Sequence, residues 1–159
     1  MESFRLISRS ADDTVAMGCA LGDLARRGDV VLLVGDLGAG KTCLTQGIAV
    51  GLGVADKVTS PTFVIIREHA GRLPLYHIDF YRLTDVDEAA DLGLDQYLYG
   101  DGVCVVEWAD RAMGLFPAEH LLIELRRMST NRRSLEMKAS GARYVSLASE
   151  LTSACSGRS

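Results

Sequence analysis

Runs of apolar residues predict several β-strands along the chain. Residues 3–8, SFRLIS, alternate between apolar and polar side chains and predict a short first strand. Residues 30–34, VVLLV, are entirely apolar and rich in β-branched side chains, which is typical of a strand buried on both faces. Residues 102–108, GVCVVEW, show a similar run after a Gly-Asp-Gly turn. The chain therefore carries at least two strands suited to the centre of a sheet.

Helical spacing of apolar residues lies between these strands. Ser10 can cap a helix, with Asp13 three residues later in a capping-box pattern, and the helix is expected to end near Gly28. Further helices are predicted at about residues 41–52, 85–92 and 141–150.

Two strand pairs complete the predicted sheet. Residues 62–80 read as two strands joined near Gly71, and residues 121–128 and 133–140 alternate on either side of a turn-like STNR segment. The alternation of strands and helices predicts an α/β three-layer sandwich, whose mixed sheet has a parallel centre and antiparallel additions. We expect one domain over residues 1–150 and a flexible tail over the small, polar residues 151–159.

Composition is that of an ordinary globular chain, with 48% hydrophobic and 24% charged residues. The net charge of −4 gives no strong field toward nucleic acid, so contact with RNA would need a local patch or another subunit. The four cysteines are widely spread and suit free thiols of a reducing cytosol better than a disulfide framework. The N-terminal segment has no apolar core of a secretory signal, and no apolar run reaches about 18 residues. We expect a cytoplasmic protein without a membrane segment.

The segment GDLGAGKT, residues 35–42, matches the phosphate-binding pattern G-x-x-x-x-G-K-[ST] in full. Its glycines let several backbone N–H groups point at one anion, and the following helix adds its positive dipole end. Lys41 supplies a charge for the β- and γ-phosphates, and Thr42 offers a hydroxyl to Mg²⁺. Since a buried strand precedes the loop and a helical pattern follows it, the sequence predicts a P-loop NTPase-like fold.

Two carboxylates end predicted strands and could complete a hydrolytic site. Asp79 ends LPLYHID, and Glu107 ends GVCVVE. Ligands of α/β sheets bind at the carboxyl ends of strands, and phosphate transfer needs an acid for Mg²⁺ and a group that positions the nucleophile. Spacing alone leaves open which carboxylate is the direct Mg²⁺ ligand and which positions water.

Other candidate residues have simpler interpretations. TSPTF, residues 59–63, resembles a γ-phosphate switch but equally an ordinary turn. His77 in an apolar strand is best interpreted as a hydrogen-bonded core residue, and Trp108 as either core or a contact beside the nucleotide. Tyr81 and Arg82 could shape the same edge. Four arginines surround the predicted turn between the last two strands: Arg126, Arg127, Arg132 and Arg133. A solvated turn is a slightly favoured interpretation over a contact with tRNA or a partner protein.

The order of the motifs GDLGAGKT, SPTF, LYHIDFYRL and VEW strongly resembles the TsaE (YjeE) family of small bacterial P-loop ATPases. The likeness runs from the first strand to about Ala139. It implies a part in the threonylcarbamoylation of adenosine 37 in tRNAs that read ANN codons. It also implies that ATP and Mg²⁺ are the cofactors, and that slow ATP hydrolysis serves a complex of the proteins TsaD and TsaB. Contact with tRNA would then be indirect, through that complex.

The resemblance also assigns roles to individual residues. It implies that Glu107 is associated with Mg²⁺ together with Thr42, that Asp79 is needed for hydrolysis, and that Lys41 acts on the phosphates. Cys43 departs from the threonine common at that position, and we expect little change in chemistry. The nucleotide-binding residues implied are Asp36, Leu37, Gly38, Ala39, Gly40, Lys41, Thr42, Cys43, Thr62 and Trp108.

Two other functions of P-loop proteins fit the sequence less well than this ATPase. A small-molecule kinase usually carries a mobile arginine-bearing lid, and no segment reads clearly as one, although the arginine-rich turn could serve. A GTPase should carry an N-K-x-D motif, and neither Lys57 nor Lys138 lies in one. Adenine is therefore favoured over guanine, and the kinase is kept as the alternative.

Overall fold

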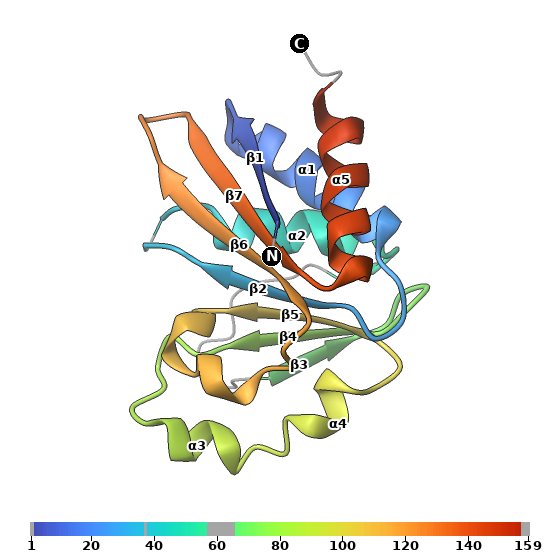
Figure 1. The fold of residues 1–159 in the computed structure, drawn as a ribbon, viewed down its shortest axis with the longest axis vertical. Helices are drawn as coiled ribbons and strands as arrows, with labels where there is room; N and C mark the ends of the chain where they lie inside the picture. The colour runs from blue at the N-terminus through green and yellow to red at the C-terminus, as the bar shows by residue number, and fades with distance from the viewer. Residues whose placement is uncertain (1, 37, 57–65, 157–159) are drawn as a thin grey trace.

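The computed structural model describes residues 2–36, 38–56 and 66–156 of the 159-residue chain. Within these ranges the strands form one mixed sheet in the order β1-β7-β6-β2-β5-β4-β3, with helices on both faces (Figure 1). The strands are β1 (Glu2–Ser8), β2 (Val30–Val34), β3 (Ile66–His69), β4 (Leu75–Asp79), β5 (Val103–Glu107), β6 (His120–Arg127) and β7 (Arg133–Ser140). The helices are α1 (Ala11–Leu24), α2 (Lys41–Gly51), α3 (Val86–Ala90), α4 (Asp95–Leu98) and α5 (Ala142–Ser156), with short 3₁₀ turns η1 (Ala109–Arg111) and η2 (Met113–Leu115).

Strand directions confirm the predicted parallel centre with antiparallel additions. Strand β2 pairs in parallel with β5 and β6, and β4 pairs in parallel with β5. The pairs β3–β4, β6–β7 and β1–β7 are antiparallel. The predicted second hairpin is present, and so is the β3–β4 pairing as far as Ile66, where the described part of that strand begins.

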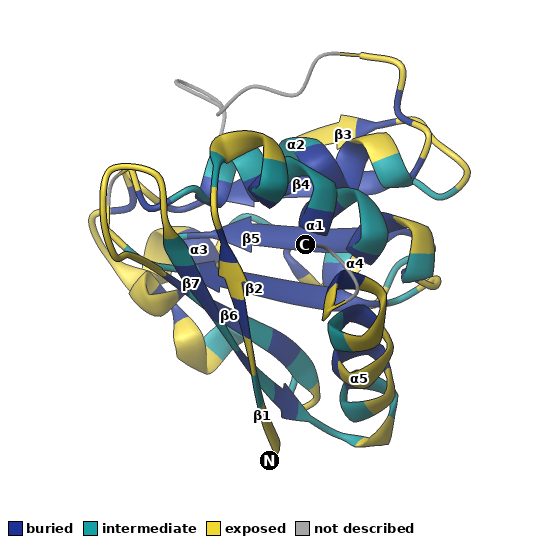
Figure 2. Cartoon of the chain, turned by 90° about the horizontal axis from the view of Figure 1, so that it is seen from above, coloured by how far each residue is buried: buried dark blue, intermediate teal, exposed yellow. Residues whose placement is uncertain are grey.

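The sheet separates two hydrophobic cores, because successive side chains of a strand point to opposite faces. In β2, Val31 and Leu33 pack with α1, α2 and α5, whereas Val30 and Leu32 pack with α3, α4 and the 3₁₀ turns. The central strands are accordingly buried along their length (Figure 2). This burial explains why β2 and β5 are continuous apolar runs.

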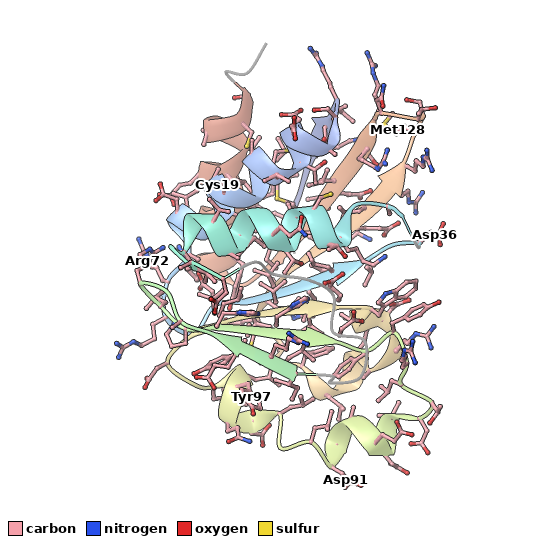
Figure 3. All side chains as sticks on the ribbon, turned by 180° about the vertical axis from the view of Figure 1, so that it is seen from behind. Cys19, Asp36, Arg72, Asp91, Tyr97 and Met128 are labelled. Carbon is pink, nitrogen blue, oxygen red and sulfur yellow. The ribbon has the colours of Figure 1, made fainter. Side chains whose placement is uncertain are left out.

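Helices α1 and α2 pack unusually closely, because glycines face each other at their crossing. A Cβ at Gly47 would lie 2.1 Å from the carbonyl oxygen of Val15, and one at Gly51 would lie 2.2 Å from that of Cys19. In the view from behind, Cys19 of α1 lies close to α2 (Figure 3). Since α2 begins at the glycine-rich loop, this packing helps to place the loop.

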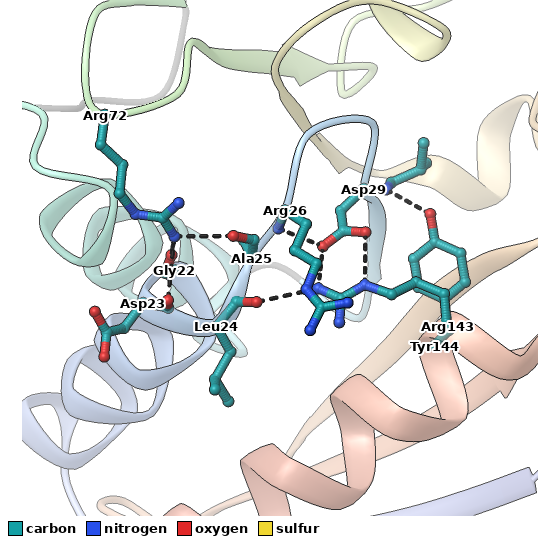
Figure 4. A network of polar contacts seen from close by, with 10 residues as sticks. Gly22, Asp23, Leu24, Ala25, Arg26, Asp29, Arg72, Arg143 and Tyr144 are labelled. Atoms are coloured by element: carbon teal, nitrogen blue, oxygen red, sulfur yellow. Dashed lines mark hydrogen bonds and ion pairs between the residues drawn. The ribbon is translucent and has the colours of Figure 1, made fainter.

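Polar contacts tie the end of α1 and the start of β2 to α5 (Figure 4). The guanidinium of Arg143 donates to Asp29 Oδ1 at 3.0 Å and Oδ2 at 2.7 Å, and to the carbonyl of Leu24 at 3.0 Å. The Tyr144 hydroxyl accepts a hydrogen bond from the backbone N–H of Val30 at 3.0 Å. These contacts join segments more than a hundred residues apart in sequence.

Two predicted helix ends were wrong. Helix α5 continues to Ser156, so residues 151–156 are not a flexible tail: Leu151 and Cys155 extend the buried stripe of the helix by one more turn. Helix α1 ends at Leu24, and Gly28 lies in the following turn with φ of 87°. At the end of α5 the small residues 152–156 hid the boundary, and at the end of α1 the glycine that suggested a cap lies four residues beyond the last helical residue. Within the described ranges, no helix combines the length and apolar character needed to cross a bilayer.

Candidate functional site

The glycine-rich loop and the two predicted acids meet at one edge of the sheet. In the strand register Leu33 lies beside Glu107, and Glu107 lies beside Asp79. Each of these strands runs toward the same edge, so the carboxylates end beside the loop that follows β2. Lys41, Asp79 and Glu107 are all buried, at 5%, 8% and 2% exposure. The edge therefore gathers three ionisable groups in a site shielded from solvent.

Local backbone geometry explains the glycines of the loop. Gly40 stands at the N-cap of α2 with φ of 106°, a left-handed conformation that other residues rarely adopt. At Gly35, with φ of 147°, a Cβ would lie 2.4 Å from the carbonyl oxygen of Leu125 in β6. A larger residue at either position would therefore strain or displace the loop.

The Lys41 ammonium lies inside this loop. Its Nζ donates to the carbonyl oxygens of Gly35 at 2.6 Å and Asp36 at 2.9 Å, and lies 4.1 Å from the centroid of the Trp108 ring. Burial lowers the pKa of Lys41, and the negative charge of Glu107 is the largest opposing influence. The ammonium is thus held inside the loop by two of its carbonyl groups.

Glu107 connects the loop helix to the neighbouring strand. Its Oε1 lies 3.4 Å from the Thr42 hydroxyl, a long hydrogen bond, and its Oε2 lies 2.5 Å from His77 Nε2. Of the two acids Glu107 is therefore the one in contact with Thr42. The expectation of a buried, hydrogen-bonded His77 is confirmed, and its partner proves to be a site carboxylate.

Asp79 lies beside Glu107 without sharing its contacts. Its Oδ1 accepts a hydrogen bond from the backbone N–H of Tyr81 at 2.9 Å. Burial raises the pKa of Asp79, and the charge of Glu107 adds to the effect, against the lowering by the Tyr81 hydrogen bond. A carboxyl with a raised pKa at such a site is suited to proton exchange or to orienting water.

The donor set fits a magnesium ion that also binds phosphate. No cluster of three or more His, Cys, Asp or Glu able to hold a metal occurs among the described residues. Mg²⁺ prefers oxygen ligands and is commonly bound by one or two carboxylates together with phosphates and water. The Thr42 hydroxyl and the Glu107 carboxylate match that preference.

Trp108 is the one non-glycine residue with positive φ in the described chain, at 59°. This conformation turns its half-buried ring toward Lys41, and the ring also lies 5.1 Å from that of Tyr81. The Arg111 guanidinium lies 5.4 Å from the Trp108 ring centroid. Trp108 therefore belongs to the site edge and has a backbone conformation that non-glycine residues rarely adopt.

A cavity of about 610 Å³ lies beside the loop, on the side of β6. Glu124 lies next to Val34 in the strand register, so the end of β6 forms a wall that sequence reasoning did not predict. Only the pairing of β6 with β2, which has no local signal, brings it there. The lining residues are Val34, Gly35, Asp36, Ala39, Trp108, Asp110, Glu124, Leu125, Arg126 and Arg127.

The remaining predicted nucleotide-binding residues differ in exposure, and two of them lie outside the described residues. Asp36 and Gly38 are exposed and Cys43 is half-buried, all in the loop or its helix. Figure 3 shows Asp36 at the outer edge of the molecule. Leu37 and Thr62, with the TSPTF segment, lie outside the described residues.

Three of the four arginines of the β6–β7 turn have side-chain partners within the hairpin: Arg126, Arg127 and Arg133. Arg126 pairs with Glu124, and Arg127 Nε donates to the Ser129 carbonyl at 3.3 Å. Arg133 donates to the carbonyls of Ser129, Thr130 and Arg132. These contacts support the favoured interpretation of a solvated turn, although Arg126 and Arg127 also line the cavity.

Comparison with known proteins identifies the family. The family model described as "Threonylcarbamoyl adenosine biosynthesis protein TsaE" matches residues 8–135. The chain belongs to the TsaE family. Its members named for tRNA threonylcarbamoyladenosine biosynthesis include a Bacillus subtilis protein, 44% identical over 153 residues, covering 96% of each chain. A Treponema pallidum member is 44% identical over 131 residues, covering 82% of this chain and 97% of the relative.

A solved structure with clear sequence similarity has the same fold. The crystal structure of YdiB from Bacillus subtilis matches with a TM-score of 0.81 and 39% identity, covering 96% of both chains. The match agrees with the α/β, P-loop-like architecture. Membership of the TsaE family therefore places the protein in tRNA threonylcarbamoyladenosine biosynthesis.

Proposed function

We propose that the protein is a Mg²⁺-dependent ATPase required for threonylcarbamoylation of adenosine 37 in ANN-decoding tRNAs. The observation that supports this best is the contact of the loop helix with a strand-end acid that has a second acid beside it: Thr42 contacts Glu107, and Asp79 lies beside Glu107 in register. A loop that only bound phosphate would not need both acids at its edge. The tRNA-modification role of the family gives the hydrolysis its context.

The residues of the candidate site have separate roles in this proposal. The loop N–H groups and Lys41 would bind the phosphates, while Thr42 and Glu107 would hold Mg²⁺, which neutralises charge on the phosphates when bound. Asp79 would orient the attacking water and accept its proton. The cavity beside β6 is large enough for the nucleoside portion, with Trp108 at its edge.

We further propose that hydrolysis drives or resets a complex of TsaB and TsaD, which bears the contact with tRNA. The net charge of −4 and the pairing of Arg126 and Arg133 within the hairpin support an indirect contact with tRNA over a direct one. This work would take place in the cytoplasm. Hydrolysis by the isolated protein is expected to be slow, because the partners complete the active assembly.

The deciding experiment measures phosphate release from ATP and from GTP, with and without a cognate TsaB–TsaD pair. We expect ATP to be preferred and its hydrolysis to rise when the pair is added. Unchanged hydrolysis would contradict the coupling to the pair. Transfer of ³²P from ATP to a metabolite would instead favour the alternative, a small-molecule kinase.

Substitution of the two acids tests their separate roles. Asp79→Ala is expected to lower turnover by about 100-fold or more while nucleotide still binds, since it removes the group that positions water. Glu107→Ala should weaken the Mg²⁺ dependence of binding itself. Asp101→Asn, at an exposed residue preceding β5, is the control. Normal hydrolysis by Asp79→Ala would show that the assignment of Asp79 is wrong.

A further inference from the structure

His77 lies under the candidate site, on the sheet face that α2 covers. It is fully buried in β4, two residues before Asp79, so both side chains point to the same face. Glu107 projects from the neighbouring strand β5 to that face as well. The sheet itself therefore brings an imidazole and a carboxylate together beneath the loop helix.

The two oxygens of the Glu107 carboxylate have different partners. Oε2 lies 2.5 Å from His77 Nε2, and Oε1 lies 3.4 Å from the Thr42 hydroxyl. An ionised carboxylate can only accept hydrogen bonds, so with Glu107 in the ionised form that binds a cation the proton of this contact lies on Nε2 of the ring. The short contact is to the rigid strand and the long contact to the helix that begins the loop. The orientation of the carboxylate is thus set from the strand side.

We propose that His77 is a positioning residue for Glu107. Its Nε2–H fixes Oε2, and Oε1 is thereby directed at the Thr42 hydroxyl, where the Mg²⁺ of the proposed function would bind. This inference rests on that proposed function. The arrangement resembles the outer-shell hydrogen bonds that orient ligands in metal sites, where the loss of such a partner weakens metal affinity about 10–100-fold.

The other nitrogen of the ring argues against a role in packing alone. Nδ1 of His77 is buried without a hydrogen-bond partner among the described residues. An unsatisfied buried nitrogen costs free energy, so an apolar side chain would suit a purely structural position better. What distinguishes His77 from His69, whose Nε2 is also unpartnered among the described residues, is its contact with Glu107.

The test measures binding of ADP through the fluorescence of Trp108, the one tryptophan of the chain, in EDTA and over a Mg²⁺ titration. In His77→Leu we expect the Mg²⁺ concentration for half-maximal effect to rise about tenfold or more, while affinity in EDTA stays near that of the wild type. His77→Gln, whose amide can still donate toward Glu107, should restore most of the Mg²⁺ response. Circular dichroism checks the fold of each variant.

His69 offers a matched control. It is a buried histidine on the adjacent strand β3, beside Leu75, and among the described residues its Nε2 is unpartnered and it has no hydrogen bond or ion pair with Glu107. His69→Leu should therefore leave the Mg²⁺ titration unchanged. If His77→Leu does not fold, His77→Asn replaces it, because its shorter amide is polar but does not reach the position of Nε2.

Three results would overturn the inference. The first is a wild-type Mg²⁺ response in the variant that lacks the donor. The second is an equal loss of ADP affinity in EDTA and in Mg²⁺ for both the Leu and Gln variants, which indicates a structural role. The third is an ADP affinity of the wild-type protein that does not change with Mg²⁺ concentration. This result would overturn the proposed function and this inference with it.

Discussion

Asp79 combines two properties that conflict at the scale of a single residue. It is buried at 8% exposure, which disfavours the charged form, yet the proposed role in hydrolysis needs the carboxylate. Its raised pKa is the expression of this conflict. Residues of this kind reduce stability for the benefit of function.

Replacement of Asp79 by Asn should therefore stabilise the fold. The amide has nearly the same shape, its oxygen can still accept from the Tyr81 N–H, and the free energy of unfolding at pH 7 should rise by about 1 kcal/mol. Because the pKa of Asp79 is higher in the folded protein than in the unfolded chain, protonation favours the folded state. The burial penalty is thus absent below the unfolded pKa and grows as the pH rises through the folded one.

Urea denaturation of both proteins between pH 4 and about pH 8 checks this sign. The advantage of Asp79→Asn over the wild type should be largest at neutral pH and shrink as the pH falls. An advantage that grew toward acid pH would contradict a raised pKa of Asp79.

At the scale of elements, the crossing of α1 and α2 decides where the loop lies. Glycines line the crossing, so the two helix backbones lie so close that a Cβ on one glycine would overlap backbone atoms of the other helix. Gly47→Ala should lower the free energy of unfolding by about 1–3 kcal/mol, because the added Cβ meets the Val15 carbonyl and outweighs the gain in helix propensity. The displaced α2 should also weaken nucleotide binding.

Gly114→Ala provides the comparison for this prediction. A Cβ at Gly114 would meet no atom within 4 Å, so the substitution should change stability little. Thermal unfolding of the two variants distinguishes a close-packed crossing from a general effect of adding a methyl group. Equal melting temperatures would count against the close packing.

At the scale of the whole molecule, the pair of buried Asp29 and half-buried Arg143 holds the last helix to the start of β2. Arg143→Met would leave the Asp29 carboxylate buried, with the Arg26 N–H as its remaining described partner, and should cost about 2–3 kcal/mol. The double variant Asp29→Asn with Arg143→Met should recover part of this loss.

The exposed pair of Arg27 and Asp101 is the matched control for a double-mutant cycle. Its atoms are 3.7 Å apart and its side chains are 70% and 81% exposed, so Arg27→Met should cost less than about 1 kcal/mol. Similar losses of unfolding free energy for Arg143→Met and Arg27→Met in denaturant titrations would show that the pair of Asp29 and Arg143 stabilises the fold no more than an exposed pair does.

Local signals allowed the sequence alone to predict much of this protein. Periodicity and short motifs predicted the α/β class, the loop at residues 35–42 and the strand-end positions of Asp79 and Glu107. Such signals lie entirely within short stretches of the chain, so they can be read without knowing the tertiary structure. The contact of His77 with Glu107, the choice of Glu107 over Asp79 as the neighbour of Thr42, and the wall that β6 adds to the cavity were decided by the tertiary structure. Each depends on which strands lie side by side, and strand pairing is set by packing of the whole sheet between its two helical layers. The length of α5 was decided in the same way, since Leu151 and Cys155 become core residues only where the last helix packs against the sheet and α1.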